Sequence, residues 1–331
     1  MSMNTYVVGL LVAGVAATWP SVVGAQNPTE WPTMTSKEAQ TLVASATALA
    51  RNDLVAEGQD ACSERGPARD PDPRPRIRVE PLKVFDNLYF IGFEQIGAWV
   101  LRTSDGLILF DTLNTPMEAE TVLEPDMRQL GLDPANIKYI ILSHGHRDHY
   151  GGAPYFQQKY GTPVLLTAAD WDLMARPRTG RGGRGGTPPP LPKRDMEIRD
   201  GQTLTLGDTT IRFGIYPGHT SGTIMMSVPV MDRGVRRVWL IPGGALQVPN
   251  RESLQAFEHI MNDYFKPAKP EMLFNSHPLT MSDGLGHMDQ IRKNPDGPNP
   301  YVFGQERMAR YMDIILQCRR AWVIEKEAAG S

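Results

Sequence analysis

Apolar residues in this chain gather in short runs separated by turn-forming residues, which is the pattern of a strand-rich fold. The run 107–110 is continuous rather than alternating, as expected of a strand covered on both faces, and residues 138–142 predict another buried strand. Shorter or alternating runs predict further strands at 84–85, 88–91, 98–103, 164–166, 197–198, 203–206, 210–213, 223–228, 235–241 and 272–274.

Helical periodicity marks several other segments. A helix is predicted from Thr35 to Gln59, with Thr35 or Ser36 as its N-cap. Further helices are predicted at 117–130, 154–159, 168–174, 253–265 and 305–322. The predicted elements occur twice in the same order, with strands first and helices after them. This order indicates an α+β fold in which two sheets pack face to face with helices outside.

A Pro/Arg-rich stretch separates the first helix from the first strands. Pro67, Pro71, Pro73 and Pro75 alternate with arginines, a composition typical of a linker. We therefore expect a helical extension and linker over residues 26–78 and the main catalytic domain over residues 79–331.

The N-terminus predicts export. An apolar run of eleven residues at 7–17 is followed by Val23-Gly24-Ala25, which suits cleavage after Ala25 and defines a signal peptide over residues 1–25. The run is shorter than the roughly 20 residues of a membrane span, so a periplasmic or secreted protein with no membrane contact after cleavage is expected. No Lys or Arg precedes Lys37, which leaves a buried helix or an uncleaved anchor as alternatives.

Charge and cysteine content narrow the function classes. The 331 residues are 41% hydrophobic and 21% charged, with a net charge of −3. This balance gives no basis for nucleic-acid binding, so no nucleic acid is expected as a partner. Cys62 and Cys318 are the two cysteines; in an oxidising compartment they can pair, or they can be separate buried thiols, and the sequence leaves both possibilities open.

The segment His144-Gly145-His146-Arg147-Asp148-His149 follows the predicted strand 138–142 directly. Three of the seven histidines of the chain lie here, beside a carboxylate. Residues two apart on an extended chain point to one side, so His144 and His146 can grip one ion while Asp148 and His149 face a second. Imidazole and carboxylate are ligands that zinc accepts.

Two more histidines follow predicted strands. His219 lies in Pro-Gly-His-Thr-Ser-Gly-Thr at 217–223, and His277 comes shortly after strand 272–274. His259 falls within a predicted helix and is expected to be structural or solvated. His287 is expected in a Gly-rich loop, with either a structural or a functional role.

Taken together, the H-x-H-x-D-H run, the strand 105–111 before it and the Pro-Gly-His-Thr-x-Gly-Thr segment after it resemble the metallo-β-lactamase superfamily, over roughly residues 84–277. The resemblance implies an αββα sandwich with the metal site at one end of the two sheets. It also implies two Zn²⁺ ions: one held by His144, His146 and His219, the other held by Asp148, His149 and His277.

One departure from the family pattern concerns residues 242–246, which read Pro-Gly-Gly-Ala-Leu. Glyoxalase II and the di-metal lactonases place a bridging Asp here, and one subclass of zinc β-lactamases places a Cys. A second site of Asp, His and His alone resembles subclass B3 metallo-β-lactamases. The serines with which those enzymes hold the β-lactam carboxylate have no match in this stretch.

The resemblance implies hydrolysis of a small molecule, in which metal-bound hydroxide attacks a carbonyl and Asp148 is both ligand and catalytic orienter of the nucleophile. A β-lactam amide is the first expectation. The alternatives are a lactone, ester or other amide, a metal-binding protein without turnover, and an iron redox enzyme of this fold. Six basic residues within 176–194 suit an anionic substrate, although a solvated loop explains them at least as well.

Overall fold

The computed structural model describes residues 30–64, 75–176, 190–279 and 283–330. The predicted signal peptide, most of the predicted linker and the middle of the basic loop lie outside these residues. Within the described ranges, no helix combines the length and the apolar character that a membrane crossing requires.

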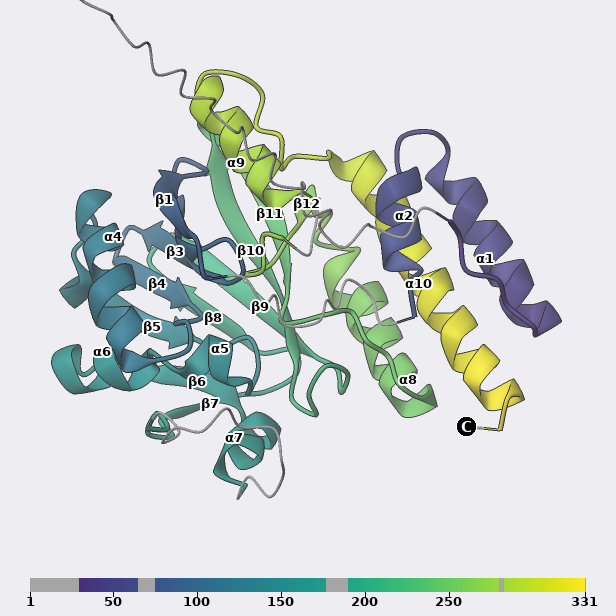
Figure 1. The fold of residues 1–331 in the computed structure, drawn as a ribbon, viewed down its shortest axis with the longest axis horizontal. Helices are drawn as coiled ribbons and strands as arrows, with labels where there is room; N and C mark the ends of the chain where they lie inside the picture. Colours follow the sequence, from purple (N-terminus) through teal and green to yellow (C-terminus); the bar gives the residue numbers. More distant parts are fainter. Residues whose placement is uncertain (1–29, 65–74, 177–189, 280–282, 331) are drawn as a thin grey trace, which may run out of the picture.

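The first of two β-sheets has seven strands in chain order (Figure 1). Strands β1 to β4 pair antiparallel, and β5 to β7 continue the sheet in parallel from β4. The strands are β1 Arg78–Lys83, β2 Leu88–Phe93, β3 Gly97–Thr103, β4 Gly106–Phe110, β5 Ile137–Ile141, β6 Val164–Thr167 and β7 Met196–Ile198.

The second sheet has five strands in the order β12-β11-β10-β9-β8. All its pairs are antiparallel except the short β12, which runs parallel to β11. The strands are β8 Thr203–Leu206, β9 Thr209–Ile215, β10 Ile224–Asp232, β11 Val235–Pro242 and β12 Met272–Leu273.

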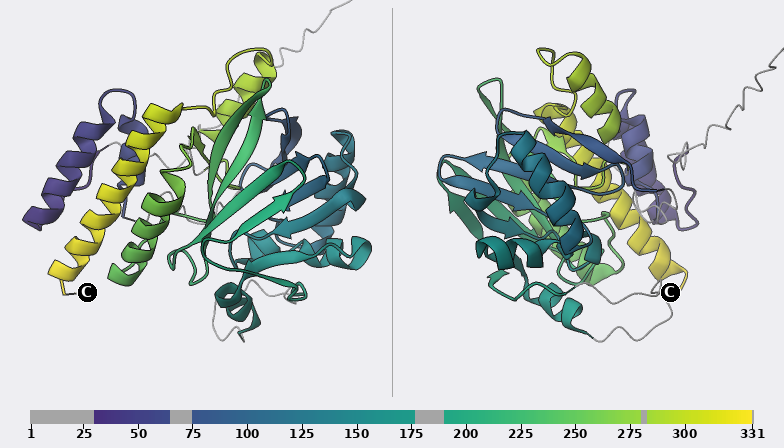
Figure 2. Two further views of the ribbon diagram at one scale, coloured as in Figure 1. Left: turned by 180° about the vertical axis from the view of Figure 1, so that it is seen from behind. Right: turned by 60° about the vertical axis from the view of Figure 1, so that its left-hand side comes forward.

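Aromatic side chains fill the space between the sheets. Trp99 and Trp239 meet edge to face at 5.6 Å, and Phe274 stacks on Trp239 at 4.6 Å. Strand β4 shows why its apolar run is continuous: Ile108 joins this inner core, whereas Leu109 joins a second core under helices outside the first sheet. The layers seen in Figure 2 confirm the predicted sandwich of two sheets with outer helices.

The helices lie on the outer faces of the two sheets and at one end of the molecule. Two helical stretches change into π turns along their length, at 119–123 and 260–265. The elements are α1 Lys37–Ala50, α2 Val55–Ala61, α3 Pro116–Glu118, η1 Ala119–Leu123, α4 Glu124–Gln129, η2 Pro134–Asn136, α5 Arg147–Tyr150, α6 Ala153–Tyr160, α7 Ala168–Ala175, α8 Arg251–His259, η3 Ile260–Phe265, α9 Gly284–Lys293 and α10 Gln305–Ala328.

Three sequence predictions need correction. The predicted helix 35–59 is two helices, because Arg51 adopts φ +49° and ends α1, although Ser36 does cap its start by accepting from the N–H of Ala39. Residues 84–85 form the turn between β1 and β2, with both N–H groups donating to Leu88 O. His287 lies within α9 and not in a loop, with its ring 4.8 Å from that of Tyr301.

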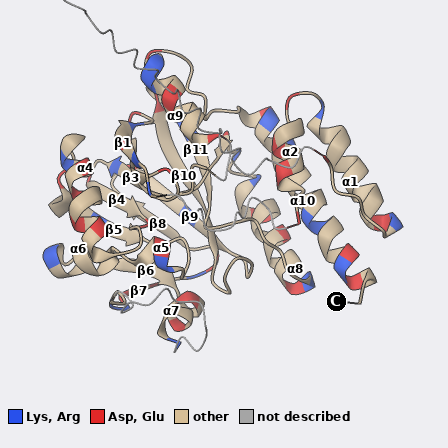
Figure 3. Ribbon diagram, in the orientation of Figure 1, with Lys and Arg blue, Asp and Glu red and all other residues tan. Residues whose placement is uncertain are grey.

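The N-terminal extension packs on the last helix, with α1 and α2 against α10 (Figures 1 and 2). Small residues such as Ala39 and Ala46 lie on the buried side of α1, which allows close approach. Charged residues of both signs occur on these helices (Figure 3), and Arg310 of α10 pairs with Asp53 at 2.7 Å. Cys62 and Cys318 form a disulfide between the end of α2 and α10. The sequence left open a disulfide or two separate buried thiols, and the structure has the disulfide.

A polar cluster joins α4 to α6. Glu124 accepts hydrogen bonds from Tyr155 at 2.6 Å, Lys159 at 2.9 Å and Arg128 at 2.9 Å. Burial opposes ionisation of Glu124, but these three donors outweigh it and lower the pKa of the carboxyl to about 2 from its ordinary 4.5.

Glu124→Gln is therefore expected to lower the free energy of unfolding by about 1 kcal/mol at pH 7. Because the folded pKa is depressed, the stabilisation is fully present above about pH 5 and is lost as the pH falls from 5 towards 2. Urea unfolding of the metal-free protein at pH 7 and pH 3 measures this. The exposed Glu120→Gln is the control, and a difference between Glu124→Gln and wild type that is the same at both pH values would contradict the assignment.

Candidate metal centre

Two residues, Leu142 and Ser143, separate the end of β5 from the H-x-H-x-D-H segment. His144 and Gly145 are buried, His146 is exposed, and α5 starts at Arg147. Strand β5 is central in its sheet, between β4 and β6, so the segment leaves the carboxyl end of a fixed strand. The short helix then turns Asp148 and His149 away from the extended His144–His146 portion.

Three imidazoles converge at the first group. His146 Nδ1 lies 3.0 Å from His144 Nε2 and 3.0 Å from His219 Nε2. All three ligand atoms lie within 4.8 Å of one another. Zn–N bonds of 2.0–2.1 Å in a tetrahedral site would place nitrogens roughly 3.3 Å apart, so the three residues fit a zinc ion.

The second group combines two imidazoles with a carboxylate. His149 Nε2 lies 3.1 Å from His277 Nε2, and Asp148 Oδ2 lies 3.6 Å and 3.5 Å from these two nitrogens. The rings of His144 and His149 are 4.0 Å apart between centroids, so the two groups adjoin. The structure thus brings together all six residues that the sequence nominates, from three separate segments, in the two predicted sets.

Asp111 holds the second group from behind. This buried carboxylate accepts a hydrogen bond from His149 Nδ1 at 2.8 Å. The bond turns His149 Nε2 towards Asp148 and His277, the other two residues of the group. Its oxygens also accept from the N–H of Ser143 at 2.9 Å and the hydroxyl of Ser276 at 2.7 Å. The sequence reasoning included Asp111 in the strand that carries the resemblance but gave it no role.

Asp170 of α7 connects the two loops of the first group. Its carboxylate accepts from the N–H of Gly145 at 2.7 Å, the hydroxyl of Thr220 at 2.6 Å and the N–H of Gly222 at 3.0 Å. Asp170 is fully buried, and these bonds fix the His144–His146 loop against the His219 loop. Sequence reasoning missed this residue, which no local motif marks.

The inner core fixes the segment that carries His277. The indole N–H of Trp239 donates to Phe274 O at 2.9 Å, and that of Trp99 donates to Asn275 O at 3.1 Å. His277 Nδ1 then donates to Gln95 O at 2.7 Å, which leaves Nε2 to face His149.

Burial and neighbouring charges set the protonation of the donors. Burial, with the other imidazoles, holds the pKa of His144 well below its usual range and lowers the pKa of His219 to about 4. Burial opposes ionisation of Asp148, but the nearby imidazoles lower its pKa to about 2. Burial opposes a charge on His149 as well, yet Asp111 and Asp148 raise its pKa to about 9. At neutral pH His149 is protonated, so a cation that binds it displaces a proton. His144 and His219 are neutral at this pH, and each offers a nitrogen lone pair to a cation.

Residues 243–244 leave no room for another ligand. A Cβ atom on Gly244 would lie 2.6 Å from Cδ2 of His219, and one on Gly243 would lie 2.4 Å from Ile224 O. A side chain at either position would have to displace the ring or the backbone. Where the sequence lacks an Asp or Cys, Gly243 thus packs against neighbouring backbone and Gly244 packs against the His219 side chain.

The other two histidines of the chain, and Arg194 of the basic loop, lie apart from this centre. His259 pairs with Asp263 at 2.6 Å, and His287 contacts Tyr301. Of the basic loop, residues 177–189 lie outside the described chain; Arg194, beyond them, pairs with Asp172 and Glu197. Those contacts of Arg194 are structural rather than directed at the metal centre.

Residues 91–235 match the family model described as the metallo-beta-lactamase superfamily. Over these residues the chain is similar to that superfamily, as its motifs predicted. Solved structures agree. The subclass B3 metallo-beta-lactamase BJP-1 of Bradyrhizobium japonicum has TM-score 0.59 and 25% identity over 76% of this chain and 97% of its own. FEZ-1 of Legionella gormanii shares the fold at TM-score 0.61 and 19% identity, over 78% of this chain and 99% of its own.

Curated relatives match over shorter stretches. The N-acyl homoserine lactonase AiiB of Agrobacterium fabrum is 25% identical over 181 residues, 40% of this chain and 57% of its own. The Mycobacterium leprae protein ML0493 is 31% identical over 116 residues, 31% of this chain and 53% of its own. A hydroxyacylglutathione hydrolase of Acidiphilium cryptum is 31% identical over 88 residues, 27% of this chain and 29% of its own. The chain spans about half the length of the first curated relatives it matches.

Proposed function

We propose that this chain is a zinc-dependent hydrolase that opens the carbonyl bond of a small molecule, with a β-lactam amide as the first candidate. The observation that carries the proposal is the convergence of five imidazoles and one carboxylate into two adjoining three-donor groups. Bound zinc lowers the pKa of water towards ~7 and polarises a carbonyl, which makes hydroxide available at neutral pH.

The residues of the two groups, and Asp111 behind them, have separate roles in this reaction. His144, His146 and His219 hold one zinc, and Asp148, His149 and His277 hold the other. Asp111 orients His149 and balances its charge. Asp148, whose side chain is 36% exposed, is the only one of the six that is both anionic and open to solvent, so it also orients the attacking water.

Two observations favour a β-lactam over a lactone. BJP-1, at 25% identity, is a subclass B3 metallo-beta-lactamase. Residues 243–244 exclude the bridging Asp expected of lactonases and glyoxalase II. The relatives AiiB, named a lactonase, and the hydroxyacylglutathione hydrolase support the second candidate, a lactone, other ester or amide.

Export to the periplasm or the medium belongs to the same proposal. The disulfide Cys62–Cys318 supports it, because disulfides persist in oxidising compartments.

A substrate panel tests the proposal. Purified protein with measured zinc content is assayed on a chromogenic cephalosporin, several lactones and aryl esters, with and without chelator. We expect cephalosporin hydrolysis that chelator abolishes and zinc restores. Turnover of lactones alone would select the second candidate. Full zinc occupancy with no turnover would indicate a binding protein, and bound iron with no hydrolysis would indicate redox chemistry.

A further inference from the structure

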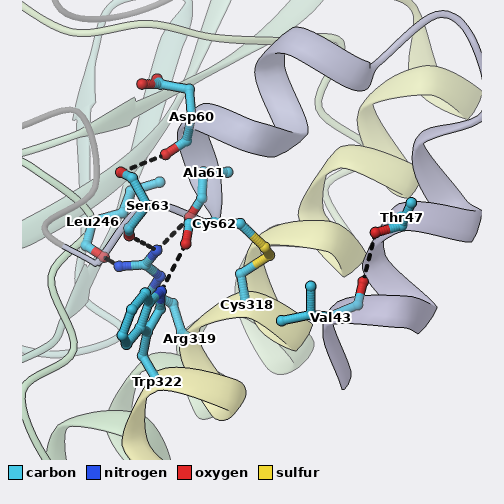
Figure 4. Close-up of a disulfide and its surroundings, with 10 residues drawn as sticks. All are labelled: Val43, Thr47, Asp60, Ala61, Cys62, Ser63, Leu246, Cys318, Arg319 and Trp322. Carbon is cyan, nitrogen blue, oxygen red and sulfur yellow. Dashed lines mark hydrogen bonds between the residues drawn. A yellow bond between two sulfur atoms is a disulfide. The ribbon is translucent and has the colours of Figure 1, made fainter. Parts of the chain in front are cut away.

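Arg319 of α10 is a buried cation whose acceptors are main-chain carbonyls. Its side chain is 1% exposed, and its guanidinium donates to the carbonyls of Ala61, Ser63 at 2.7 Å and Leu246 at 3.2 Å (Figure 4). A buried charge is costly unless hydrogen bonds compensate it, so these three carbonyls have to remain in place around it.

The disulfide lies beside these bonds. Cys62 stands between Ala61 and Ser63, the two acceptors at the end of α2, and Cys318 immediately precedes Arg319 (Figure 4). The indole N–H of Trp322 donates to Cys62 O at 2.7 Å. The disulfide and the Trp322 bond together hold the end of α2 against one turn of α10, where Arg319 reaches both.

The third acceptor belongs to the segment 243–248, which follows β11 and borders the metal centre. Leu246 is buried in the same apolar cluster as Cys62 and Cys318. On its other side the segment abuts the His219 loop: a Cβ on Gly244 would meet the His219 ring, and Gln247 O would lie 2.3 Å from a Cβ on Gly218.

We propose that Arg319, held by the disulfide-anchored N-terminal extension, is a positioning residue for His219: it fixes segment 243–248, against which the His219 imidazole rests. The inference depends on the proposed metal binding. When the carbonyls of Ala61 and Ser63 move away, the guanidinium keeps only Leu246 O, and segment 243–248 shifts with it.

The effect is confined to one metal group. The second group is supported from elsewhere, by Asp111 behind His149 and by Gln95 O behind His277. Loss of the Arg319 contacts therefore weakens zinc binding at His144, His146 and His219 and spares binding at Asp148, His149 and His277. A merely structural role of Arg319 would weaken both groups alike.

Zinc titration of the full chain against a chelating dye tests this, with each group isolated in turn. The His277→Ala background reports the first group, and the His219→Ala background reports the second. Arg319→Met is expected to raise the zinc dissociation constant roughly tenfold in the first background and to leave it unchanged in the second. Hydrogen exchange of residues 243–248 is expected to increase in parallel.

Arg310→Met is the matched control, because Arg310 lies on the same helix and donates to Leu49 O at 3.0 Å and to Asp53, but not to segment 243–248. It is expected to lower Tm without changing either zinc dissociation constant. If Arg319→Met does not fold, the double variant Cys62→Ser, Cys318→Ser gives the same comparison.

Three results would overturn the inference: equal weakening in both backgrounds, the same weakening from Arg310→Met, or no change from Arg319→Met and the cysteine variant. A wild-type chain that binds no zinc would instead defeat the proposed function, on which the inference rests.

Discussion

Replacing His146 with alanine is expected to reduce hydrolysis by more than about a hundredfold, because loss of a direct ligand exceeds the effect of losing a supporting contact. His146 Nδ1 is the middle donor of its group, 3.0 Å from the nearest nitrogens of both His144 and His219. Its side chain is exposed, so its removal leaves the buried core intact. Asp148→Ala is expected to have the same consequence through the second group.

Turnover, bound zinc and far-UV circular dichroism of each variant measure this expectation. His259→Ala is the control, since His259 is an exposed histidine whose contacts are with Asp263 and Tyr264. Its turnover should equal that of wild type. Unchanged turnover in His146→Ala or Asp148→Ala would contradict the assignment of the metal centre.

Asp111→Ala is expected to have the second largest effect, on both zinc binding and stability. The substitution strips a buried imidazole of its charged partner and leaves the donors of Ser143 and Ser276 without an acceptor. Breaking a buried pair of this kind costs about 3–5 kcal/mol in the free energy of unfolding. Zinc affinity of the second group is expected to fall about 10–100-fold because His149 is no longer oriented.

Denaturant unfolding of the metal-free protein and zinc titration of the His219→Ala background separate the two consequences. Asp105→Ala, an exposed carboxylate just before β4, should change the free energy of unfolding by less than about 0.5 kcal/mol. An Asp111→Ala variant with wild-type zinc affinity would show that Asp111 acts on stability alone.

The main strands could be predicted because their signal is local. Residues 140–142 are apolar and buried, because β5 lies between β4 and β6 in its sheet. The break between α1 and α2 could not be predicted, because a left-handed Arg51 has no signature of its own and contacts with α10 determine the path. Helix α9 was missed because Gly284 and Gly286 suggest a loop, yet both lie within its first turn.

The candidate metal ligands could also be predicted from local signals, because each belongs to a short motif that follows a predicted strand. Their supports are not local. Asp170 acts on Gly145, 25 positions before it, and on Thr220, 50 positions after it. Cys62 and Cys318 are separated by 256 residues, so the sequence had no means of deciding their pairing.

The pairing of α1 and α2 with α10 bears on how the polypeptide reaches its final shape. Helices α1 and α2 bury their apolar faces only after α10 has been synthesised, because α10 supplies the surface against which Val43, Ala46 and Ala50 are buried. Such distant contacts slow folding, since a long loop has to close before they form. A growing chain therefore leaves the apolar faces of α1 and α2 uncovered until residues 305–328 have been synthesised, and exposed apolar surface of this kind is what chaperones bind and what leads to misassociation with other chains.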